Sequence, residues 1–176
     1  MTTDTLVAAE IAAKNATENA TETGSHVKPT QLVSGTFVTT DLKRTRRMCE
    51  ELLGLECVEP EMGVLLVRED GHQPGGALAG KPYWVLEARE VSSIETPQEM
   101  LNHWGVFVSS QAAVDAAFEK INARQKDFGL GRVQKPRFRH GSYAFYFVDG
   151  DSNWWEIEYR TPELLYTTLR EKGDQH

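Results

Sequence analysis

Two stretches of this 176-residue chain follow the same order of hydrophobic patterns. Each begins with a strand-like run of alternating apolar residues, continues with an amphipathic helix, and ends with further strand-like runs. The first stretch covers residues 31–92 and the second covers residues 101–160. A unit that occurs twice in a chain of this length predicts two similar modules that share a single domain.

The first module is predicted to open with a strand over residues 32–41. The helix that follows begins at Leu42 and ends before Gly54, because glycine is the usual residue at a helix C-terminus. Two strand-like runs come next, at residues 63–69 and 83–91, separated by a connection rich in Gly and Pro.

The second module repeats this order. A strand is predicted over 102–110, and a helix follows from Gln111, with its apolar face formed by Val114, Ala117, Phe118 and Ile121. Strand-like runs over 142–149 and 153–160 complete the module.

Aligning the first strands of the two modules pairs Ser34 with His103, an offset of 69 residues, and the same offset pairs Glu87 with Glu156. Neighbouring residues of a strand point to opposite faces, so both glutamates can point away from the helices while the residues beside them pack. An isolated Glu in a strand is more often simply exposed, and a lone His is more often structural. The joint occurrence of two carboxylates and a histidine at equivalent positions favours a clustered functional site. In that site both carboxylates, Ser34 and His103 would surround one concavity.

The two ends are predicted to differ from the modules. Residues 1–28 are rich in Thr, Ala, Asn and Glu and are expected to form a flexible tail, which leaves residues 29–176 as the domain. Thr161 and Pro162 are typical of a helix start and predict a short terminal helix over 162–171.

Composition narrows the setting. The net charge of -7 argues against a nucleic-acid partner, and no apolar run approaches the roughly 18 residues that a membrane span needs. Two cysteines without metal spacing, and an N-terminus without a secretory signal, predict a cytoplasmic protein. The basic run "KRTRR" at residues 43–47 is interpreted as the solvated face of a helix.

The segments "DLKRTRRMCEELLGL" and "FYFVDGDSNWWEIEY" resemble the vicinal-oxygen-chelate superfamily, which includes glyoxalase I, bleomycin resistance proteins and extradiol ring-cleaving dioxygenases. The resemblance covers residues 31–160. It implies an α+β fold in which two βαβββ modules form a cupped mixed sheet around a shared cavity. Members of this family often complete their cavities across a dimer, so the resemblance also suggests a homodimer.

The resemblance further implies a divalent metal ion. His103 and Glu156 match the ligands of the second module, and Glu87 matches the last-strand ligand of the first. Ser34 stands where a His or Gln is expected, and a hydroxyl is a poor ligand for these ions. Fe(II) is the favoured ion, with Zn(II), Mn(II) and Ni(II) as alternatives, and the departure at Ser34 leaves a site without metal as a further alternative.

The stretch "HGSYAFYFVDGDSNWWE" partly resembles the signature of extradiol dioxygenases, so the preferred function is cleavage of a catechol-like aromatic ring. In that hypothesis His140 is the acid or base, and Tyr146 hydrogen-bonds a developing oxyanion. The stretch departs from the signature in its His-to-Tyr spacing and at Gly150 and Ser152. The structural alternative makes Tyr146 a core residue and His140 a loop residue.

Two other functions stay open. A lyase or isomerase similar to glyoxalase I would use Glu87 or Glu156 to move a proton through an enediolate. A metal-free protein that sequesters small molecules would instead use a cavity lined by aromatic residues. In every case the partner is a small molecule, and the predicted cavity residues are Ser34, Trp84, Phe107 and Trp154.

Overall fold

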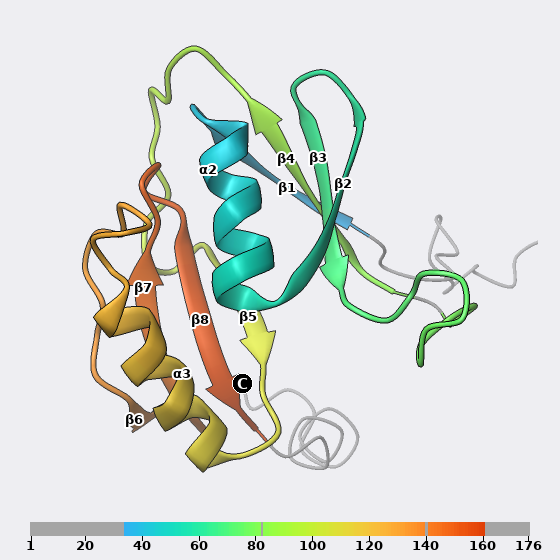
Figure 1. Cartoon of the computed structure of the whole chain (residues 1–176). Coiled ribbons are helices and arrows are strands. Elements are labelled where there is room, and N and C mark those ends of the chain that lie inside the picture. The colour runs from blue at the N-terminus through green and yellow to red at the C-terminus, as the bar shows by residue number, and fades with distance from the viewer. Residues whose placement is uncertain (1–33, 82, 140, 161–176) are drawn as a thin grey trace, which may run out of the picture. The chain divides into compact units, whose positions relative to one another are not determined.

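The computed structural model describes residues 34–81, 83–139 and 141–160. Figure 1 shows the arrangement of the elements. The first module contains β1 (Ser34–Thr39), α2 (Leu42–Arg47), the π-helical segment η1 (Met48–Leu53), β2 (Leu55–Glu61), β3 (Val64–Glu69) and β4 (Val85–Glu90). The second contains β5 (His103–Phe107), α3 (Gln111–Ala123), β6 (Arg137–Arg139), β7 (Ser142–Val148) and β8 (Trp154–Tyr159). Among the residues described, no helix combines the length and apolar character that crossing a membrane requires.

The strands form two four-stranded mixed sheets, in the orders β1-β4-β3-β2 and β5-β8-β7-β6. In each sheet the first and last strands of the module are parallel, and the remaining pairs are antiparallel. The prediction of an α+β fold with two βαβββ modules is therefore confirmed. The predicted tail over 1–28 and the predicted helix over 162–171 lie outside the described residues.

The sequence did not locate β2 and β6, which are the edge strands of their sheets. The last four residues of β2 are exposed, and this strand contains Pro60. β6 is three residues long and has the sequence Arg-Phe-Arg. An edge strand buries little of either face and can carry charge, so neither segment has the apolar alternation that marks a central strand.

The strand registers confirm the offset of 69 residues. Ser34 lies opposite Val85 in the first module, and His103 lies opposite Trp154 in the second. Thr36 lies opposite Glu87 in the same way that Gly105 lies opposite Glu156. The two glutamates therefore occupy equivalent positions in the two sheets.

The predicted helix of the first module is present and changes type along its length. The Asp41 side chain accepts a hydrogen bond from the Arg44 amide and caps the start of α2. The last six residues, Met48–Leu53, form the π-helical segment η1. Gly54 ends it with φ 70°, a left-handed conformation that glycine adopts without a Cβ penalty.

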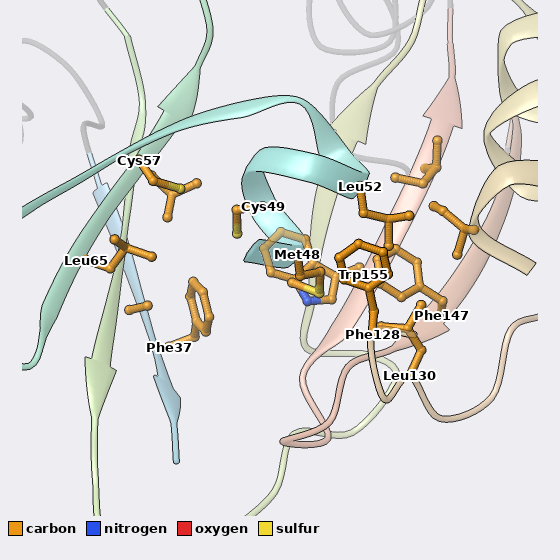
Figure 2. Packing of buried hydrophobic residues seen from close by; sticks show 14 of the residues in the cluster. Phe37, Met48, Cys49, Leu52, Cys57, Leu65, Phe128, Leu130, Phe147 and Trp155 are labelled. Carbon is orange, nitrogen blue, oxygen red and sulfur yellow. The ribbon is translucent and has the colours of Figure 1, made fainter. Parts of the chain in front are cut away.

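One apolar cluster joins both modules, and α2–η1 contributes to its centre through Met48, Cys49 and Leu52. Figure 2 shows this helix between the apolar residues of the first sheet and those of the second, among them Trp155. The Phe37 ring meets the Trp155 ring edge-on, with centroids 5.6 Å apart. Both sheets thus turn their helix-packing faces toward a common core, and their other faces, here called the open faces, point away from it.

Polar contacts also join the modules. Asp151 is buried in the turn before β8 and accepts hydrogen bonds from Thr39 and Thr40 at 2.7 and 2.6 Å. Arg44 Nη2 lies 2.6 Å from the same carboxylate. The predicted basic helix face is consequently only partly a solvated surface, because Arg44 contacts the second module.

Candidate metal centre

His103 and Glu156 meet on the open face of the second sheet. His103 is the first residue of β5, and Glu156 is the third residue of the neighbouring parallel strand β8. Their side chains approach with His103 Nε2 3.0 Å from Glu156 Oε2. His103 Nδ1 lies 2.8 Å from the backbone carbonyl of Met100.

The contact to Met100 determines where the imidazole carries its proton. A carbonyl oxygen only accepts hydrogen bonds, so Nδ1 must hold a proton, and the Nε2 of a neutral His103 presents its lone pair to Glu156. A lone pair facing a carboxylate is repulsive unless a proton or a cation lies between or beside them. An imidazole held by an Nδ1–H···O=C bond is the usual arrangement of a metal-binding histidine.

The separation of the two donor atoms also fits a metal ion. Ligand atoms bound at about 2.1 Å in adjacent octahedral positions lie about 3.0 Å apart. The distance between His103 Nε2 and Glu156 Oε2 is the same. Imidazole nitrogen and carboxylate oxygen are both common ligands of first-row divalent ions. These two residues therefore suit a divalent cation.

Tyr146 lies beside this pair. It is the cross-strand partner of Glu156 in β7, and its ring meets the His103 ring edge-on with centroids 5.0 Å apart. Burial, followed by a hydrogen bond to Glu156, raises the pKa of Tyr146 well above its usual value. The phenol is therefore protonated at physiological pH and serves as a hydrogen-bond donor.

A second carboxylate on this face, Glu158, was not selected from the sequence. It is 5% exposed and lies two residues after Glu156, hence on the same face of β8. Burial raises its pKa, as does the nearby charge of Glu156. Glu158 packs beside Gly105, where an added Cβ would lie at an ordinary contact distance of 3.6 Å from Glu158 Oε1. The alternation Glu-Ile-Glu was the signal that could have identified it.

The structure does not bring Glu87 to His103 and Glu156 within the chain. Glu87 lies on the open face of the first sheet and forms an ion pair with Arg89. Ser34 is exposed at the start of β1. Across residues 34–81, 83–139 and 141–160, no three His, Cys, Asp or Glu side chains form a group that could hold a metal ion. One chain thus supplies two of the three predicted ligands in one place.

The remaining predicted residues have different surroundings. Trp154 is half-buried opposite His103. Phe107 and Trp84 are 55% and 51% exposed, and Trp84 precedes β4. The predicted cavity residues therefore do not enclose a cavity by themselves, and their role stays a prediction. His140 lies outside the described residues.

Comparison with known proteins identifies the fold. No protein-family model and no curated protein matches the sequence. Among solved structures, the fosfomycin resistance protein FosX from Listeria monocytogenes, complexed with Mn(II) and 1S,2S-dihydroxypropylphosphonic acid, is 18% identical with a TM-score of 0.59. The match covers 81% of this chain and 100% of that one.

Two further structures show the same architecture. A glyoxalase/bleomycin resistance protein/dioxygenase from Nocardioides is 17% identical, with a TM-score of 0.53 over 85% of this chain and 94% of its own. FosX from Mesorhizobium loti is 19% identical, with a TM-score of 0.50 over 80% of this chain and 99% of its own. This chain has the fold of the vicinal-oxygen-chelate superfamily.

Proposed function

We propose that this protein is a divalent-metal-dependent enzyme that binds a small substrate through two adjacent oxygens. The observation that carries the proposal is the contact between His103 Nε2 and Glu156 Oε2 at 3.0 Å, with His103 held by the Met100 carbonyl. His103 and Glu156 would hold the ion. When bound, the ion would polarise substrate oxygens and stabilise negative charge on them.

The donor set favours Mn(II) over the Fe(II) expected from the sequence. Non-haem Fe(II) oxygenases characteristically use two histidines and one carboxylate. Here His103 is the one histidine beside Glu156 in the part of the chain that the structure describes, and the equivalent residues of the first module are Ser34 and Glu87. An oxygen-rich set suits Mn(II), and the FosX structure from Listeria contains Mn(II).

The missing ligands would come from a second copy of the chain. The open faces of the two sheets point away from the shared core, so Glu87 and Glu156 of one chain do not face one another. A homodimer that places the first module of one chain against the second module of the other would bring Glu87 to His103 and Glu156. It would also enclose the cavity that a single chain leaves open.

Hydration of a small acidic epoxide is the reaction that we propose first. A dihydroxypropylphosphonic acid, as seen in the Listeria FosX complex, is the diol that such a hydration yields. Protonated Tyr146 would donate a hydrogen bond to the oxygen that gains charge as the ring opens. The Tyr146 side chain hydrogen-bonds to Glu156. When a substrate binds, the phenol would turn from Glu156 toward the substrate oxygen.

Extradiol ring cleavage is the second candidate. It is favoured by the position of Tyr146 beside the His103–Glu156 pair, where a donor to an oxyanion is required. A proton transfer of the glyoxalase kind would use the same carboxylate and remains the third.

A direct test supplies metal-free protein with Mn(II), Fe(II) or Zn(II) and measures three reactions. These are diol formation from an epoxide phosphonate by ³¹P NMR, O2 uptake with catechols, and isomerisation of a hemithioacetal. We expect Mn(II)-dependent diol formation that Glu156→Gln abolishes. O2 uptake with Fe(II), without diol formation, would instead favour the dioxygenase. No metal-dependent turnover in any assay would contradict the proposal.

A further inference from the structure

A cationic groove lies at the edge of the second sheet, outside the His103–Glu156 pair. It has a volume of about 340 Å³, and its lining is the continuous segment from Arg132 to Arg137. This segment contributes three cationic side chains, those of Arg132, Lys135 and Arg137, together with the amide of Gln134. A groove of this size is within the range of about 300–1,000 Å³ that holds small molecules.

The backbone of this groove is held in place by β7. The Arg132 carbonyl accepts a hydrogen bond from the Val148 amide at 3.1 Å, and the Gln134 amide donates to the Tyr146 carbonyl at 2.8 Å. The ladder then pauses at Pro136, which has no amide hydrogen to donate, and resumes in β6. The register against β7 shifts by one residue across this interruption, from Val133–Phe147 to Arg137–Ala144.

The charges of the groove are not neutralised within the described part of the chain. Arg132, Lys135 and Arg137 form no ion pair with the carboxylates described, and Arg137 Nη2 makes its contact with the neutral Gln134 Oε1, at 3.3 Å. The chain as a whole carries a net charge of -7. Arg132, Lys135 and Arg137 are exposed, so this segment is a local concentration of positive charge on an acidic chain and attracts anions.

We propose that this groove binds the phosphate group of a small phosphorylated molecule. Two guanidinium groups and one ammonium group provide the many directed donors that a phosphate accepts, and guanidinium groups bind phosphate oxygens in pairs. A single carboxylate would engage fewer of these donors. The inference depends neither on a metal ion nor on the proposed reaction, because none of the groove residues belongs to the His103–Glu156 pair.

The test is a calorimetric titration of EDTA-treated full-length protein with inorganic pyrophosphate and, separately, with adenosine diphosphate. We expect saturable binding of one anion per chain, and Lys135→Gln and Arg137→Gln should each weaken it about tenfold. Lys43→Gln is the matched control, since Lys43 is an exposed cation on α2 that contacts no part of the groove. Tighter binding of the nucleotide than of pyrophosphate would identify a phosphorylated nucleoside as the ligand class, whereas equal binding would indicate recognition of the phosphates alone.

Glu156→Gln separates this site from the metal centre, because it should bind pyrophosphate as the unaltered protein does. If the unaltered protein failed to bind metal but still bound pyrophosphate, the proposed function would be refuted and the groove supported. Absence of saturable binding, or equal weakening by Lys43→Gln, would overturn the inference. Much tighter binding of single-stranded DNA than of either small anion would also overturn it, in favour of a nucleic-acid surface.

Discussion

His103 Nε2 and Glu156 Oε2 lie 3.0 Å apart across two parallel strands, and the Met100 carbonyl holds the far side of the imidazole. The ring orientation and the proton position are thus set by the protein backbone. This is the preorganisation that a metal-binding histidine needs, because a fixed ring loses less freedom when the ion binds. The strand pairing that brings His103 and Glu156 together is common to both modules, since β5 and β8 pair in the same register as β1 and β4.

Tyr146→Phe should slow turnover about a hundredfold while changing the affinity for Mn(II) less than about threefold. The Tyr146 ring lies beside the His103–Glu156 pair, where its phenol would donate a hydrogen bond to the substrate and would not hold the ion. Kinetics and a Mn(II) titration of the same sample measure the two effects separately. Unchanged turnover would indicate that Tyr146 has only a packing role.

The second prediction concerns the polar contact between the modules. Asp151→Asn should lower the free energy of unfolding by about 2–4 kcal/mol at pH 7, because Arg44 would lose its buried partner. Urea unfolding measures this cost. The exposed pair Arg46–Glu50 offers a control, and Glu50→Gln should cost less than about 1 kcal/mol.

The cost of Asp151→Asn should also depend on pH. Burial opposes ionisation of Asp151, but hydrogen bonds from Thr39, Thr40 and Arg44 outweigh it, so its pKa lies below the ordinary value of 3.8. A lowered pKa stabilises the fold above the ordinary value, and this contribution is lost as pH falls through the lowered one. The difference between the two proteins should therefore shrink below about pH 4, and a constant difference would rule out this role for the charge.

Substitution by alanine should destabilise the protein to different extents at two glycines, one in the first strand of each module. A Cβ at Gly35 would lie 2.7 Å from the Trp104 ring, whereas at Gly105 the nearest atom would be 3.6 Å away. Gly35→Ala is expected to cost about 1–3 kcal/mol through overpacking, and Gly105→Ala should cost less than about 1 kcal/mol. Thermal unfolding of both variants measures their losses of stability. Equal losses would contradict the close packing of Gly35 against Trp104.

Mixed dimers test whether Glu87 of a second copy completes the metal site. His103→Ala and Glu87→Gln should each lose most Mn(II) binding when purified alone. Coexpressed with different tags, they should regain about a quarter of the unaltered capacity, because half of the randomly formed dimers contain one intact site out of two. No recovery in a purified mixed dimer would argue against a site shared between chains.

The equivalence of Glu87 and Glu156 could be predicted from the sequence because the two modules repeat with a single offset of 69 residues, which the strand registers match. The separation of their open faces could not, since it depends on how α2–η1 packs between the two sheets. Glu158 was missed because a charged residue near a strand end is usually exposed. The contact of His103 with the Met100 carbonyl involves a backbone atom, so no residue type in the sequence marks it.

Calorimetric titration of metal-free protein with Mn(II) decides whether His103 and Glu156 hold a metal ion. Saturable binding is expected, and His103→Ala and Glu156→Gln should both abolish it without unfolding the protein. His72→Ala should retain it, although His72 also pairs with a carboxylate, at 2.9 Å from Glu69. Unaltered Mn(II) binding by Glu156→Gln, or equal loss in His72→Ala, would contradict the assignment of His103 and Glu156 as the metal centre.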